Sequence, residues 1–169
     1  EELLKLLKPS GCRQLLIGLE SILSENLKGM ERNHWKLEQY DSYLSAIEKI
    51  QSYGVSVNGC FILGLDSDDP SIFEKTRDFI VKSQLLEAQL TILTPFPGTK
   101  LYQRLKREGR LITDIFWDRC TLFDINYVPK NMTVEQLENG GVWLGSQVYS
   151  EEAYKGRIKH YKQIIKNMD

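Results

Sequence analysis

The sequence predicts an α/β fold built around a parallel sheet. Three short apolar runs, Leu15–Leu19, Val55–Leu65 and Ala88–Leu93, each lead into a loop with Gly or Pro, and helical periodicity follows. Strand, loop and helix in alternation is the pattern of parallel strands joined by crossover helices. In such folds the loops after the carboxyl ends of the strands carry the ligand-binding groups. We therefore expect function to reside in these three loops.

The first helices follow from their stop signals. Residues Glu1–Lys8 are predicted to be the end of a helix that Pro9 and Gly11 stop. Apolar residues recur with a helical period from Tyr40 to Tyr53, and Gly54 is the expected C-cap.

The next two helices have start signals. Asp69 is expected to cap the helix after the second strand, and Pro70 suits its first position. Thr99 is expected to cap a short helix after the third strand, and Gly109 to end it.

Beyond Gly109 the alternation stops, which divides the chain into residues 1–111 and 112–169. The second part is predicted to be an irregular cover segment followed by a helical extension. Thr133 and Gln136 have the spacing of a capping box at the start of that extension. Its glycines are expected to be weak points or close contacts: Gly140, Gly141 and Gly145.

Composition excludes several classes of partner. The 22 basic and 23 acidic residues nearly cancel, so there is no electrostatic case for nucleic acid or an anionic membrane. No apolar stretch approaches the roughly 20 residues that span a bilayer. Cys12, Cys60 and Cys120 are far apart, which favours free thiols and a cytoplasmic location and offers no local metal pair. Cys60 is expected to be a small core residue.

The acidic run from Asp66 to Asp69 invites comparison with a calcium loop. An EF-hand needs Gly at its sixth position and Glu at its twelfth, where this sequence has Ser71 and Arg77. We therefore interpret the run as negative charge at a helix N-terminus, where the helix dipole favours it.

Glu20 and Ser21 place a carboxylate and a hydroxyl where the first strand ends. A carboxylate there can accept hydrogen bonds from an amine or from ribose hydroxyls of a ligand. The alternative is a loop acid that caps the following turn. The residues alone leave both open.

Three segments form an ordered set along the chain. They are LIGLES at 16–21 with LKGMERNH at 27–34, GVSVNGCFILGLD at 54–66, and LTPFPGT at 93–99 with EGRL at 108–111. In this order and spacing they resemble the C-terminal half of the radical S-adenosylmethionine (SAM) domain. The resemblance is greatest to enzymes with a cobalamin-binding domain ahead of it.

The resemblance implies a fold and a set of cofactor contacts. The strands would be the fourth to sixth of a partial (β/α)6 barrel with parallel strands, followed by a helical C-terminal extension. Glu20 and Ser21 would contact the ribose or amino-acid part of SAM, and Arg32 its carboxylate. The second strand would pass the adenine. The positions placed at the cofactor are Glu20, Ser21, Arg32, Asn58, Gly59, Phe61, Gly64, Thr94 and Pro95.

The family's cluster-binding motif, Cys-x-x-x-Cys-x-x-Cys, does not occur in this sequence. The resemblance therefore implies a fragment of a radical SAM enzyme, a cobalamin-associated methyltransferase or an oxidative cyclase, acting on a small molecule. We expect SAM, a four-iron four-sulfur cluster and cobalamin to bind the full-length protein and none to bind this chain alone, which would be inactive. Its expected partners are the missing N-terminal half-barrel or a second copy of the fragment. The alternative is a non-enzymatic half-barrel interaction module.

Overall fold

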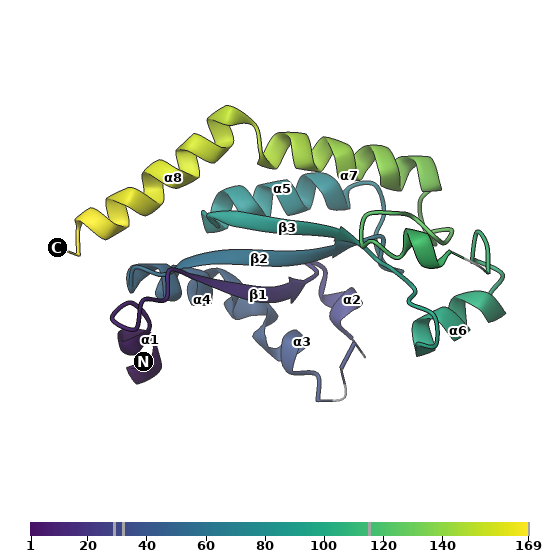
Figure 1. Cartoon of the computed structure of the whole chain (residues 1–169), viewed down its shortest axis with the longest axis horizontal. Helices are drawn as coiled ribbons and strands as arrows, with labels where there is room; N and C mark the ends of the chain where they lie inside the picture. Colours follow the sequence, from purple (N-terminus) through teal and green to yellow (C-terminus); the bar gives the residue numbers. More distant parts are fainter. Residues whose placement is uncertain (29, 32, 115, 169) are drawn as a thin grey trace.

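The computed structural model describes residues 1–28, 30–31, 33–114 and 116–168 (Figure 1). Strands and helices alternate along the first part of the chain, as predicted. The strands are β1 Gln14–Glu20, β2 Ser56–Leu63 and β3 Glu87–Ile92. The α-helices are α1 Glu2–Leu7, α2 Ser24–Leu27, α3 Trp35–Gln39, α4 Tyr43–Ser52, α5 Ile72–Ser83, α6 Lys100–Arg107, α7 Val134–Val148 and α8 Glu151–Lys166, and the 3-10 helices are η1 Tyr40–Ser42 and η2 Trp117–Arg119.

The three strands form one parallel sheet in the order β1-β2-β3. This confirms the α/β class and the parallel pairing. All three strands point the same way in Figure 1, so their carboxyl ends share one edge. The pairing of β1 with β2 is interrupted by a bulge between Gly18 and Glu20, and Glu20 pairs with Phe61 at the end of the ladder.

One face of the sheet is covered by helices. Residues of β2 alternate in burial from Val57 onward, so that Val57, Phe61 and Leu63 are buried against the helical layer. The ring of Phe61 meets that of Phe79 on α5 edge to face, at a centroid distance of 5.9 Å. Helix α7 packs along α5 and beside β3 (Figure 1).

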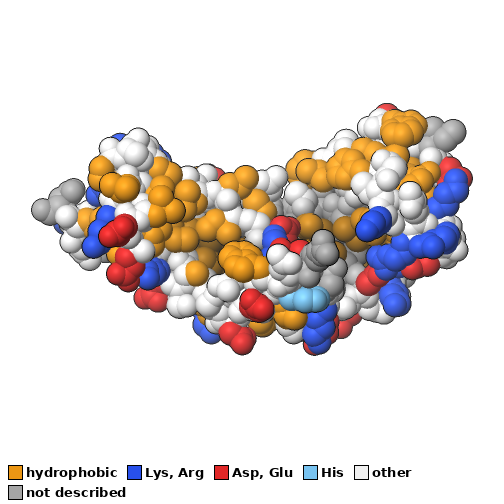
Figure 2. Space-filling view, turned by 90° about the horizontal axis from the view of Figure 1, so that it is seen from below, with side chains coloured by type: hydrophobic (Ala, Val, Ile, Leu, Met, Phe, Trp, Pro, Cys, Tyr) orange, Lys and Arg blue, Asp and Glu red, His pale blue; other side chains and the backbone are white. Residues whose placement is uncertain are grey.

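The other face of the sheet is open. No helix crosses the near side of the strands in Figure 1, and Leu16, Gly18 and Gln89 on that face are exposed. Seen edge-on, the molecule is hollowed on this side between two raised ends that carry hydrophobic side chains (Figure 2). Cys60 also lies on this face and is only half-buried. Its prediction as a core residue was wrong, because its neighbour Phe61 takes the core side of the pleat.

The outer edge of β3 is covered by the C-terminal extension. The hydroxyl of Tyr149 donates to the carbonyl oxygen of Ala88 at 2.6 Å and accepts from its N–H at 3.1 Å. Further along, the N–H of Ile92 donates to the carbonyl oxygen of Leu122 at 2.7 Å. Backbone groups that an edge strand would otherwise expose therefore have partners within the chain.

Most capping predictions are confirmed. Thr99 caps α6, and Thr133 and Gln136 form both hydrogen bonds of a capping box at the start of α7. The cap predicted for Asp69 was wrong. Helix α5 begins after Ser71, and the Asp69 carboxylate accepts the Ser71 N–H at 2.8 Å, which forms a separate turn before the helix.

The remaining helix predictions are confirmed, except that helical structure before α4 begins earlier than predicted. Helix α1 ends before Pro9, and Gly54 follows α4 with a left-handed φ of 73°. Helical structure begins earlier than Tyr40, because α3 and η1 precede α4. Among the described residues, none of the helices combines the length and apolar character needed to cross a bilayer.

Candidate functional site

At the end of β1, Glu20 pairs with a lysine from α3. Its carboxylate accepts a hydrogen bond from the ammonium group of Lys36, which also donates to the carbonyl oxygen of Gly18 at 3.1 Å. Both charged side chains are 22% exposed. Glu20 has a left-handed φ of 64°, which costs about 1–3 kcal/mol in a residue other than glycine and is typical of functional sites.

Ser21 is buried and organises the turn that follows. Its hydroxyl oxygen accepts from the N–H of Leu23 at 3.1 Å and from the side-chain amide of Asn26 at 3.1 Å. Ser21 therefore caps this turn, and the alternative that assigned capping to Glu20 is wrong. The Glu20 carboxylate is directed to the Lys36 ammonium group instead.

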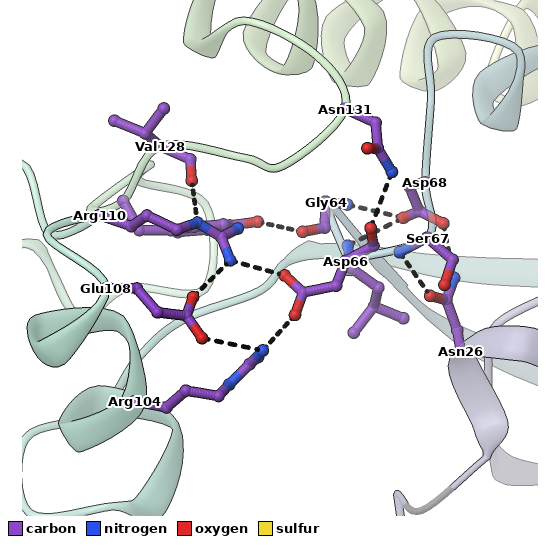
Figure 3. Close-up of polar contacts among 12 residues, drawn as sticks. Asn26, Gly64, Asp66, Ser67, Asp68, Arg104, Glu108, Arg110, Val128 and Asn131 are labelled. Carbon is purple, nitrogen blue, oxygen red and sulfur yellow. Dashed lines mark hydrogen bonds and ion pairs between the residues drawn. The ribbon is translucent and has the colours of Figure 1, made fainter.

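Asp68, in the loop after β2, is almost fully buried. Its carboxylate accepts from the N–H groups of Gly64 and Leu65, each at 2.9 Å, and from the Asn26 amide at 2.7 Å (Figure 3). Burial raises the pKa of Asp68 to about 6, against the lowering effect of these three hydrogen bonds.

Asp66, two residues earlier, faces the opposite way, toward the C-terminal part of the chain. Its carboxylate pairs with Arg104 on α6 and with Arg110, the latter at 2.9 Å (Figure 3). Burial opposes ionisation, but hydrogen bonds from both arginines hold the pKa of Asp66 below its usual value. Asp66 and Asp68 are therefore held by contacts to distant segments, which corrects the interpretation of the acidic run as helix-dipole charge alone.

The acidic loop does not form a metal site in the described part of the chain. Asp66 and Asp68 are directed to different protein donors, and no group of three or more His, Cys, Asp or Glu residues there could hold an ion. Cys12, Cys60 and Cys120 stand on three separate segments.

Gly64 forms the turn between β2 and this loop. It has a left-handed φ of 87°, and its carbonyl oxygen accepts a hydrogen bond from the buried hydroxyl of Tyr127. Burial raises the pKa of Tyr127, so this phenol remains a donor at neutral pH. The sequence did not indicate this contact between residues 63 positions apart.

The loop after β3 is compact. Thr94 and Pro95 are both buried, and the Thr94 hydroxyl donates to the carbonyl oxygen of Ile92 at 3.1 Å. The Phe96 N–H also donates to the Thr94 carbonyl oxygen at 2.9 Å, so the loop is held by hydrogen bonds of its own.

The other predicted cofactor residues that the structure describes lie away from the carboxyl ends of the strands or on the sheet face that the helices cover. Asn58 and Gly59 are near the start of β2, roughly 13–17 Å from its carboxyl end at about 3.3 Å per residue. Gly59 and Phe61 face the helical core, so only their backbone could meet a ligand on the open face. Arg32 lies outside the described residues.

The structure adds residues that sequence reasoning did not assign to the site. They are Asn26, Lys36, Asp68, Arg104 and Arg110. Arg110 lies within a segment that carries the family resemblance, and Asp68 lies within the acidic run, so both had a signal. Asn26 and Lys36 had none, because an amide or a lysine in a polar loop is ordinary.

The comparisons with known proteins point to one group of enzymes. The bacteriochlorophyllide d C-12(1)-methyltransferase of Chlorobaculum tepidum is 30% identical over 158 residues, which are 94% of this chain and 33% of that protein. The hopanoid C-2 methylase of Rhodopseudomonas palustris is 34% identical over 113 residues, 67% of this chain and 21% of that protein. These matches confirm the family resemblance. The chain belongs to the radical SAM enzyme family.

Two further matches define how much of the family this chain represents. An uncharacterized methyltransferase of Pyrococcus horikoshii is 28% identical over 168 residues, 98% of this chain and 36% of that protein. A family model described as a domain of unknown function, DUF4070, matches residues 99–169. This radical SAM family chain spans about a third of the length of the curated relatives it matches, or less.

Proposed function

We propose that this chain is the C-terminal half of the SAM-binding barrel of a radical SAM methyltransferase. The three strands would be the fourth to sixth of a partial (β/α)6 barrel, residues 1–111, and residues 112–169 its extension. The observation that carries the proposal is the carboxylate of Glu20 at the carboxyl end of β1, on a residue with a strained positive φ, in a chain whose near-entire length matches a named methyltransferase.

The groups at this edge suit SAM. The Glu20 carboxylate can accept hydrogen bonds from an amino group or ribose hydroxyls, and its present partner is itself an ammonium group, that of Lys36. Binding of the ligand would displace Lys36 or recruit it to a ligand carboxylate. The Gly64 turn and the Thr94–Pro95 loop lie at the carboxyl ends of the neighbouring strands, where the Gly64 N–H and carbonyl oxygen are already paired with Asp68 and Tyr127. The role of Arg32 as a carboxylate partner remains part of this proposal.

The residues of this chain do not fit an iron–sulfur cluster, whose ligands are closely spaced thiolates. We therefore place the cluster, and cobalamin where it is used, on the part of the protein outside this chain. The open face of the sheet, with exposed Leu16, and the hollow around it would receive that part, the N-terminal half-barrel (Figure 2).

The proposed substrate is an apolar small molecule that is methylated at carbon. Two relatives are named for a bacteriochlorophyllide and a hopanoid. A groove of about 520 Å³ beside the carboxyl end of β3 supports this class. Its apolar lining includes Leu90, Ile92, Ile112 and Phe123, of which Phe123 is 69% exposed, and the charged residues Arg119, Asp124 and Glu138 also line it.

The test uses the full-length protein that contains this chain, with its cluster reconstituted anaerobically. We expect SAM binding and 5′-deoxyadenosine formation by the wild type. Glu20→Ala should weaken SAM binding by about 1–3 kcal/mol. It should not lower the melting temperature, because alanine is strained at a positive φ in the same way as glutamate.

Glu25→Ala, at an exposed carboxylate on α2, is the matched control and should bind like the wild type. Unchanged SAM affinity in Glu20→Ala with a lowered melting temperature would make Glu20 structural. A full-length wild type that neither binds nor cleaves SAM would favour the non-enzymatic interaction module.

A further inference from the structure

We propose that Asp68 is a positioning residue for the SAM site, which holds the ends of β1 and β2 in a fixed relation through Asn26. The inference rests on the proposed function, and it concerns a residue that would not touch the ligand itself. Its basis is the set of hydrogen bonds that converge on one buried carboxylate (Figure 3).

The first arm of this arrangement fixes the turn after β2. One carboxylate oxygen of Asp68, Oδ2, accepts both the Gly64 N–H and the Leu65 N–H at 2.9 Å. Asp68 is 1% exposed, so water cannot replace it as the acceptor. Removing the carboxylate would leave the buried Gly64 N–H and the part-buried Leu65 N–H without this acceptor and release the turn from its left-handed conformation.

The second arm reaches across to β1. The other oxygen, Oδ1, accepts from the Asn26 amide at 2.7 Å, and the same amide nitrogen donates to the Ser21 hydroxyl oxygen at 3.1 Å. The Asn26 carbonyl oxygen accepts the Ser67 N–H at 3.0 Å. Asn26 therefore bridges the loop that follows Glu20 and the loop that follows Gly64.

This bridge begins where the sheet ends. The ladder between β1 and β2 stops at the pair Glu20 and Phe61, three residues before Gly64. Beyond that pair, Asn26 and Asp68 connect the two loops by side-chain hydrogen bonds. A ligand that contacts both loops depends on this distance being constant, and productive geometry tolerates only about 0.5 Å of error.

The charge of Asp68 can be changed with little interference from its neighbours. The titratable groups beside it are Asp69, next in the chain, and the Tyr127 phenol from the cover segment, while Asp66 on the same loop is directed away toward Arg104 and Arg110. The pKa values of Asp69 and Asp66 lie below the usual value and that of Tyr127 lies above it. Between pH 5.5 and 7.5, Asp68 is therefore the group among these four that changes its charge.

The experiment measures SAM dissociation constants of the reconstituted full-length protein at pH 7.5 and pH 5.5. We expect Asp68→Asn to weaken binding about tenfold at pH 7.5, since an amide must direct a donor at one of the three N–H groups. Wild-type affinity should fall toward that of Asp68→Asn at pH 5.5, and Asp68→Asn itself should change little. Asp69→Asn, at the exposed neighbour, should follow the wild type.

A second measurement on the wild type covers the case in which Asp68→Asn does not fold. The amide resonances of Gly64 and Leu65 in this chain should titrate together, with a midpoint near the pKa of Asp68. Tight SAM binding by Asp68→Asn, or amide resonances that do not titrate, would overturn the inference and leave the proposed function standing. A wild type that does not bind SAM at pH 7.5 would overturn both.

Discussion

Tyr127 donates its buried hydroxyl to the carbonyl oxygen of Gly64, and any side chain at Gly64 would collide with that hydroxyl. The contact joins the irregular cover segment to the turn that ends the central strand. Because Arg110 and Asn131 also bind Asp66 two residues further on, the loop after β2 is held by the C-terminal part of the chain as well as by Asp68.

Gly64→Ala should therefore destabilise the chain strongly. We expect a loss of about 2–4 kcal/mol in the free energy of unfolding, which combines positive-φ strain with overpacking against Tyr127 and Leu137. Gly98→Ala is the matched control, because Gly98 has a similar φ of 84° and open space where the side chain would lie. It should cost about 1–2 kcal/mol, the strain alone. Equal losses in denaturant unfolding would show that the Tyr127 contact is unimportant.

Two glycines of α7 should respond in opposite directions. A side chain at Gly140 would collide with the ring of Phe73 on α5, whereas Gly145 has nothing nearby. Gly140→Ala should cost about 1–3 kcal/mol by overpacking. Gly145→Ala should gain about 0.5–1 kcal/mol, because alanine is the better helix former. Thermal unfolding of the two variants tests this, and a shift of the same sign in both would contradict the packing of α7 on α5.

The stability of the chain should depend on pH through Asp68. Its folded pKa of about 6 lies above the value of about 3.9 in an unfolded chain. The folded state therefore binds the extra proton, and the contribution of Asp68 to stability is fully present below about pH 4 and is lost as pH rises through 6. The span is roughly 3 kcal/mol.

The measurement compares denaturant unfolding of the wild type and Asp68→Asn from pH 4 to pH 7. The difference between them should shift in favour of the wild type as the pH falls. SAM affinity is expected to weaken as the pH falls. The stability of the wild type and its affinity for SAM should therefore change in opposite directions with pH. A difference that is constant with pH would show that Asp68 is not the titrating group.

The free edge of β1 should make this chain associate with itself when it is expressed alone. Leu16 on β1 is 66% exposed and stands at the free edge of the sheet. Sedimentation at several concentrations should detect the association, and Leu16→Lys should abolish it, since a charged edge opposes pairing. Val142→Lys, at the 71% exposed residue on α7, should leave it unchanged. A strict monomer with rapidly exchanging Leu15–Leu19 amides would refute the prediction.

The sequence predicted those parts of the fold that local signals determine. The apolar runs located all three strands, and Thr99 and Thr133 capped the helices where their spacing indicated. The predictions for Cys60 and Asp69 failed for different reasons. A uniformly apolar strand does not reveal which face meets the helices, and an aspartate before a proline can form a turn of its own instead of the helix cap.

The sequence predicted where the candidate site lies, at the carboxyl ends of the strands, but it did not predict the contacts between its residues. Parallel topology placed the loops at one edge, so Glu20 and Gly64 could be identified from their positions at strand ends. The partners of Asp66, by contrast, lie 38 and 44 residues away in the sequence. Neither periodicity nor capping describes such contacts, because they depend on how α6 and the residues just after it pack against the loop after β2.

The covered edge of β3 limits how far the sheet can grow. Tyr149 and Leu122 already bind the backbone of Ala88 and Ile92, so another strand could not form an uninterrupted ladder on that side. Head-to-tail addition, with β1 of one copy on β3 of the next, is therefore blocked, and open-ended filaments cannot form by this route. Two copies could still meet β1 to β1 about a two-fold axis, and that contact closes on itself. Assembly through the sheet thus ends at two chains.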